Sequence, residues 1–187
     1  MALLESYSQP VRPAILAAFA PILTHRDIAK HERLHEAGKD GRHLYFVESG
    51  ILRAYYLLDG RDVTAHFAVA GDSITSPDSF IRCQASKYFI EALADTVAYV
   101  IERGQLDNFL ERHPEHERLA RLYTEEMYMD LLRRSESLTF LTARQRYTNL
   151  LEAKAGGLAT GTVGPRSLLP GYEPGDPQSG PGGAVAF

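Results

Sequence analysis

Short apolar runs separated by glycine turns occupy the chain from about residue 28 to residue 102. Turn signals spaced about ten residues apart are typical of antiparallel strands in a sandwich or barrel. Asp59-Gly60 is a strong hairpin signal, because glycine accepts the positive φ that a tight turn demands. The predicted strands are Ile28–Glu36, His43–Glu48, Ile51–Leu58, Asp62–Val69, Lys87–Leu93 and Thr96–Ile101.

Helical patterns flank this series of strands. Residues 13–24 predict a helix that opens at Pro13, and residues 103–112 predict a short helix. A long helix of about 25 residues follows Pro114. Its apolar residues recur in a stripe, which consists of Leu119, Tyr123, Met127, Leu131, Leu138 and Leu141.

The long helix is longer than a small β-domain can cover. We therefore expect its stripe to pair with the same stripe of a second copy, which makes the protein a homodimer. Packing of the helix along its own β-domain is the alternative.

The C-terminal part of the chain changes character twice. Thr142-Ala-Arg-Gln145 matches a capping box and predicts a further, hinge helix. From Ala153 onward glycine and proline dominate, and such a segment buries too little apolar surface to offset its ordering entropy. The predicted domains are therefore an effector domain (residues 1–112), dimerisation and hinge helices (113–152) and a disordered tail (153–187).

Composition excludes several classes of protein. The only cysteine is Cys83, so neither an intrachain disulfide framework nor a cysteine metal cluster can form. No apolar run approaches the roughly 20 residues of a membrane span, and we expect a cytoplasmic protein. The net charge is −4, whereas a complete DNA-binding domain often carries a basic excess.

The stretch Gly38-Lys-Asp-Gly-Arg-His-Leu-Tyr-Phe-Val-Glu-Ser-Gly50 resembles the first signature of cyclic nucleotide-binding domains. Together with the order of elements, it makes the chain similar to the Crp/Fnr family of transcription regulators over about residues 10–152. The resemblance implies an α+β fold. Its core is an antiparallel β-roll of the cyclic nucleotide-binding type (a double-stranded β-helix or jelly roll), with flanking helices and a long C-terminal dimerisation helix.

The same resemblance implies a function without catalysis. The chain would be the sensor and dimerisation part of a regulator that binds a small effector. DNA would be a partner only in complete members of the family. We expect neither a metal nor a cofactor.

The phosphate-binding cassette departs from the family pattern. Nucleotide-binding members carry a Gly-Glu pair, whose Glu accepts from the ribose, and later an Arg that pairs with the cyclic phosphate. The Gly-Glu pair falls on Thr75 and Ser76, and the Arg and its neighbour fall on Ser86 and Lys87. We therefore do not expect cyclic AMP to bind in the usual way, and expect another small effector or a filled roll. The candidate ligand-binding residues are Asp72, Thr75, Ser76, Arg82, Ser86 and Lys87.

A second departure lies at the C-terminus. The family continues with a helix-turn-helix domain of about sixty residues. The glycine- and proline-rich tail takes its place here, so we expect the DNA-binding domain to be lacking, through truncation or a changed reading frame.

Histidine spacing leaves other chemistry to consider. His31 with His35, and His113 with His116, have the spacing of metal ligands on a helix. The first pair falls in a predicted strand and the second in a charged turn, so we predict surface histidines. Two alternatives stay open. One is a small-molecule-binding or protein-interaction module with no transcriptional role, and the other is a cupin-like metal enzyme built on His43 and His66.

Overall fold

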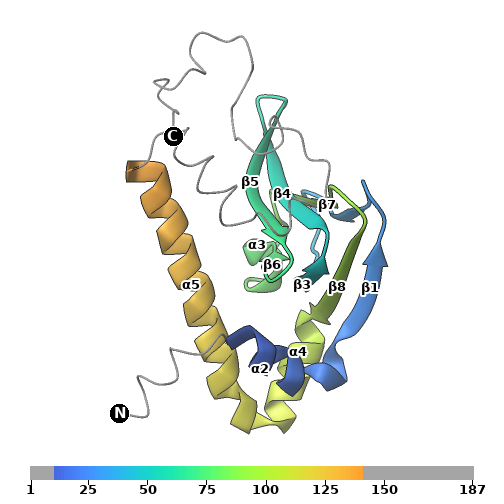
Figure 1. The fold of residues 1–187 in the computed structure, drawn as a ribbon, viewed down its shortest axis with the longest axis vertical. Helices are drawn as coiled ribbons and strands as arrows, with labels where there is room; N and C mark the ends of the chain where they lie inside the picture. Colours follow the sequence, from blue (N-terminus) through green and yellow to red (C-terminus); the bar gives the residue numbers. More distant parts are fainter. Residues whose placement is uncertain (1–10, 141–187) are drawn as a thin grey trace. The chain divides into compact units, whose positions relative to one another are not determined.

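The computed structural model describes residues 11–140 (Figure 1). These residues form two compact units, one made of residues 24–103 and the other of residues 11–23 and 104–140. The predicted division at residue 112 stays a prediction. The predicted hinge helix from Thr142, the tail 153–187 and Leu141 lie outside the described residues.

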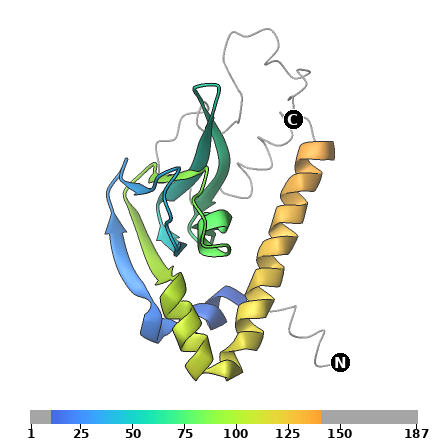
Figure 2. The same ribbon diagram turned by 180° about the vertical axis from the view of Figure 1, so that it is seen from behind.

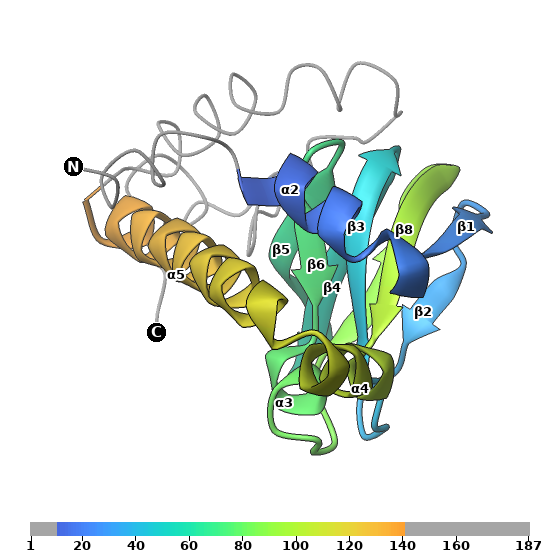
Figure 3. The same ribbon diagram turned by 90° about the horizontal axis from the view of Figure 1, so that it is seen from below.

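Residues 24–103 form a β-roll of two four-stranded sheets (Figure 3). All the strand pairs are antiparallel. The first sheet has the order β1 (Thr24–Ile28), β8 (Thr96–Glu102), β3 (His43–Ser49) and β6 (Ser73–Thr75). The second has the order β2 (Arg33–His35), β7 (Phe89–Ala92), β4 (Ile51–Leu58) and β5 (Arg61–Val69). The predicted fold class, an antiparallel roll with flanking helices and a long C-terminal helix, is confirmed.

The core of the roll lies between the two sheets. Side chains alternate between the faces of a strand, so every second residue of β4 points inward. Leu52 and Ala54 are such residues, and they pack with inward residues of both sheets, including Tyr45, Val47, Ile74, Ile90, Ala98 and Val100. This burial of apolar surface is the main term that stabilises the roll.

The predicted first strand, Ile28–Glu36, is wrong as a single element. The chain leaves β1 at Ile28 and turns at His31, which has φ 68°. It then enters β2 at Arg33, and β2 belongs to the other sheet. Glu32 fixes this turn, because its carboxylate accepts from the amide of Ala29 at 3.1 Å. Neither glycine nor proline marks the turn, so the sequence pattern runs through it.

The helix predicted over residues 13–24 is shorter than expected. It is observed as α2 (Val11–Ala18), and a single 3₁₀ turn η1 (Ala20–Ile22) follows it. Pro21 lies in that turn and cannot donate the amide hydrogen bond that would extend the α-helix.

The helical unit confirms the predicted short and long helices. They are α4 (Arg103–Arg112), the 3₁₀ turn η2 (Pro114–His116) and α5 (Glu117–Phe140), and the chain bends back between α4 and α5 (Figure 2). α2 packs against α5. The ring of Phe109 contacts Phe19 edge-on at 5.5 Å and stacks on His116 at 5.5 Å. Within residues 11–140, no helix is long and apolar enough to span a membrane.

Candidate functional site

The segment between β5 and β7, which holds most of the candidate ligand-binding residues, has its own local structure. After β5 the chain forms β6 at the edge of the first sheet, beside β3. The short helix α3 (Pro77–Phe80) follows, and Pro77 suits its first turn because the amide there needs no helical partner. A loop then leads to β7. We call residues 73–88 the cassette. Neither β6 nor α3 was predicted, since three or four residues are too few to show a recognisable periodic pattern.

Ser76 and Ser86 meet across the cassette. Ser76 Oγ donates to Ser86 Oγ at 2.5 Å, and the two residues are only 1% and 3% exposed. Ser86 Oγ also accepts from the amide of Tyr88 at 2.9 Å. Two buried hydroxyls are therefore satisfied by neutral partners, as buried polar groups generally are.

A loop from the neighbouring part of the roll holds the backbone of Ser86. The amide of Gly38 donates to Ser86 O at 2.7 Å, and the amide of Ser86 donates to Lys39 O at 3.2 Å. Ser79 braces the cassette from inside, because its buried hydroxyl donates to Gln84 O at 2.9 Å. The cassette is thus fixed by hydrogen bonds among its own residues and residues 38–39.

The other four candidate ligand-binding residues do not join the serine pair. Asp72 accepts from the amide of Val69 at 3.0 Å and shapes the turn before β6. Thr75 Oγ1 donates to His43 O at 2.7 Å.

The two cationic candidates lie at the surface. The side chain of Arg82 is 71% exposed and reaches Asp78 at 3.9 Å. Lys87 is exposed and places its ammonium 5.4 Å from the ring centre of Tyr88. Neither cation is buried beside Ser76 and Ser86.

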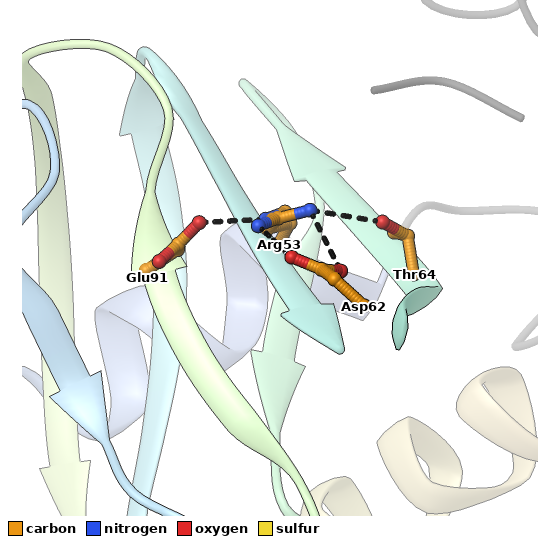
Figure 4. A network of polar contacts seen from close by, with 4 residues as sticks. All are labelled: Arg53, Asp62, Thr64 and Glu91. Carbon is orange, nitrogen blue, oxygen red and sulfur yellow. Dashed lines mark hydrogen bonds and ion pairs between the residues drawn. The ribbon is translucent and has the colours of Figure 1, made fainter. Parts of the chain in front are cut away.

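Sequence reasoning missed a charged network on β4. Arg53 donates to Glu91 Oε1 at 2.7 Å, to both carboxylate oxygens of Asp62 at 2.6 and 3.1 Å, and to Thr64 Oγ1 at 3.2 Å (Figure 4). Its guanidinium also lies 4.3 Å from the ring centre of Tyr55. Burial alone would lower the pKa of Arg53, but the hydrogen bonds to Glu91 and Asp62 raise it above its ordinary value.

The only signal for this network is the strand register. Arg53 lies directly opposite Glu91 when β4 pairs with β7. The two residues are 38 positions apart in the chain, so no local pattern links them.

The histidines separate into different environments. The prediction of surface histidines holds for His31, which is exposed, and is wrong for His35, which is 6% exposed. His43 is exposed, and His66 Nε2 lies 3.5 Å from Ser73 O. Across residues 11–140, no group of three or more His, Cys, Asp or Glu side chains is arranged to hold a metal ion.

Comparisons with known proteins agree with this geometry. The protein-family model described as the cyclic nucleotide-binding domain matches residues 25–113. No curated protein sequence matches the chain significantly.

Solved structures with the same fold are distant in sequence. A cyclic nucleotide-binding domain from Methylobacillus flagellatus has a TM-score of 0.58 at 16% identity, covering 64% of this chain and 67% of that one. FixK2 from Bradyrhizobium japonicum has a TM-score of 0.56 at 23% identity, covering 72% and 67%. The c-di-GMP-responsive global regulator CLP from Xanthomonas campestris has a TM-score of 0.55 at 16% identity, covering 75% and 70%. Residues 25–113 therefore match the cyclic nucleotide-binding domain, and the chain shares its fold with structural neighbours among Crp/Fnr-type regulators.

Proposed function

Starting from this domain, we propose that the chain is the sensor and dimerisation part of a Crp/Fnr-type transcription regulator. It is not an enzyme, and its roll responds to something other than cyclic AMP bound in the usual way. The domain match and the regulators among the structural neighbours support the first statement. The hydrogen bond between Ser76 and Ser86 carries the second.

The charge of a cyclic phosphate opposes nucleotide binding of the usual kind in this roll. A cyclic phosphate keeps one negative charge, and a charge taken into a protein interior needs a partner of opposite sign. Ser76 and Ser86 stand where the resemblance implies a carboxylate and a guanidinium, and both are neutral. Their hydroxyls already bond each other, so a nucleotide would have to break that bond and supply no compensating ion pair.

The cations at the surface do not supply the missing positive charge beside Ser76 and Ser86. Arg82 faces Asp78 and water, and Lys87 lies over Tyr88. An effector of the roll would therefore be recognised by hydroxyls and backbone groups, which favours an uncharged molecule over a phosphate ester.

Dimerisation is proposed for the outer part of α5. Four large apolar residues are exposed there within the described helix: Tyr128, Met129, Leu131 and Leu132. Leu131 belongs to the predicted stripe and is 62% exposed. Of the other stripe residues, Tyr123 is already buried in its own chain, Leu119 and Met127 are half-buried, and the side chain of Leu138 is not described.

Isothermal titration calorimetry with cyclic AMP tests the proposal. We expect no saturable binding at ligand concentrations up to about 1 mM. A matched variant, Ser76→Glu with Ser86→Arg, installs both missing charges and should bind cyclic AMP more tightly than the natural chain. Saturable binding of cyclic AMP by the natural chain with a Kd of about 10 μM or tighter would contradict the proposal.

A further inference from the structure

A buried histidine lies at the base of the loop that holds the cassette. His35 is the last residue of β2, it is 6% exposed, and it lies opposite the buried Ile90 of β7. Gly41 lies directly against its ring, because a Cβ at Gly41 would come within 2.2 Å of His35 Nδ1. The imidazole is therefore enclosed on that side by backbone, and any side chain at position 41 would displace it.

The opposite edge of the ring has no polar contact. His35 Nε2 is buried and finds no hydrogen-bond partner among residues 11–140. A neutral imidazole tolerates this, since one ring nitrogen carries no proton. An imidazolium does not, because both nitrogens then carry protons and the charge is held out of water.

The ionisable groups that act on His35 oppose one another: His43 disfavours the charged imidazolium, and the two carboxylates of Asp40 and Glu36 favour it. Both carboxylates are paired with cations, Glu36 with Lys39 at 2.7 Å and Asp40 with Arg42 at 2.7 Å, and their side chains are 43% and 41% exposed. Their charges are therefore compensated and screened by water.

The loop of residues 36–42 connects this histidine to the cassette. Its backbone makes both contacts to the Ser86 backbone, from Gly38 at 2.7 Å and to Lys39 at 3.2 Å. Ser86, which this loop holds, is hydrogen-bonded in turn to Ser76. Because Gly41 lies against the His35 ring, movement of the ring toward it would displace Gly41. Gly41 belongs to the same loop that holds Ser86.

We propose that His35 is a proton-sensitive residue of the roll, whose protonation loosens the loop of residues 36–42 and so releases the cassette at Ser86. The cassette then responds to acid without any ligand. This inference rests on the proposed function only in treating the cassette as the responsive segment of the sensor.

The direction of the pH effect follows from the pKa. Burial lowers the pKa of His35 below its ordinary value of 6.5, and His43 lowers it further, while Asp40 and Glu36 act in the opposite sense. The unfolded or locally open chain therefore takes up a proton at higher pH than the closed roll does. The stability that neutral His35 contributes is complete above about pH 6.5 and is lost as the pH falls below that value toward the folded pKa.

Hydrogen exchange of the full chain at about pH 7.5 and about pH 5.5, corrected for intrinsic exchange rates, tests the proposal. We expect the amides of Gly38 and Ser86 to lose protection at the acid pH while those of β4 keep it. His35→Leu keeps the volume of the side chain but cannot be protonated, so Gly38 and Ser86 should stay protected at both pH values. Loss of protection in β4 at the same pH would mean global unfolding, and would overturn the proposal.

Two further variants keep the test decisive if His35→Leu does not fold. His43→Gln removes a neighbour that lowers the pKa of His35, so the pKa of the closed roll moves toward that of the open chain and less protection should be lost at the acid pH. His25→Gln changes an exposed histidine of β1 that pairs with Glu48 at 3.9 Å, and should behave like the natural chain. Equal protection of the natural chain at both pH values, or an undiminished loss of protection in His43→Gln, would overturn the proposal. No effector is added, so such a failure leaves the proposed function standing.

Discussion

At the scale of single residues, the roll keeps charge on its surface and away from the buried hydroxyls of Ser76 and Ser86. Strand alternation puts Arg53 on the opposite face of β4 from the core residues Leu52 and Ala54. Its side chain and that of Glu91 are each 15% exposed, so water screens this ion pair only weakly. The cassette, in contrast, is closed by two neutral hydroxyls.

Replacing Arg53 by leucine should destabilise the roll by about 2 kcal/mol, because Glu91 would be left half-buried without its cation. Urea unfolding followed by circular dichroism measures this. Arg42→Leu is the matched control. It breaks an exposed pair with Asp40, in which the side chains are 45% and 41% exposed, and should cost less than about 1 kcal/mol. If the two variants lost equal free energies of unfolding, the Arg53 network would contribute no more than an exposed ion pair does.

Sequence patterns predict least well those residues whose neighbours are set by the tertiary fold. Ser76 and Ser86 were identified by their positions in a resemblance, and the structure brings them together. Arg53 and Glu91 were missed because only the register of β4 and β7 makes them neighbours. His35 was placed at the surface because a one-strand reading of residues 28–36 hid the turn and the bulge between Arg33 and His35.

At the scale of elements, the glycine turns explain most of what the sequence predicted correctly. The hairpin at Asp59-Gly60 forms with φ of 51° and 77°, which is the geometry that the dipeptide favours. Long repeated patterns such as α5 were also predicted. The short elements β6 and α3 were not, because packing rather than local periodicity fixes them.

Two glycines give a direct test of these turns. Gly50 has φ 88°, and a Cβ there would lie 2.4 Å from Asp95 O, whereas Gly60 has φ 77° and open space around it. Gly60→Ala should cost about 1 kcal/mol for the left-handed backbone alone. Gly50→Ala should cost at least about 2 kcal/mol more, because the chain around Asp95 must also move. Thermal or urea unfolding compares them, and equal costs would contradict the close approach at Gly50.

The exposed part of α5 is tested by its oligomeric state. Leu131→Glu should convert a dimer into monomers in analytical ultracentrifugation, since a charge would enter an apolar interface. Arg133→Glu is the control with the same new side chain, because two residues further along a helix lies on the opposite side. A Leu131→Glu variant that remains dimeric, or a natural chain that is monomeric, would contradict dimerisation through this stripe.

At the scale of the whole molecule, the chain combines a β-roll of the cyclic nucleotide-binding type with a cassette that is closed by two neutral hydroxyls. Turn spacing predicted antiparallel strands, the family resemblance implied the β-roll, and the comparisons agree with that fold class. Neither the fold class nor the comparisons identify the effector. Recognition depends on a few side chains, and Ser76 and Ser86 are neutral where the resemblance implies a carboxylate and a guanidinium.

The most direct test of the central claim is a double-mutant cycle on Ser76→Ala and Ser86→Ala, measured by urea unfolding. The claim is that these two hydroxyls close the cassette on each other. It predicts a coupling free energy of about 1 kcal/mol between them. Thr75→Ala with Ser86→Ala should be additive, because Thr75 bonds His43 O instead. A coupling within about 0.3 kcal/mol of zero for Ser76 and Ser86 would contradict the account.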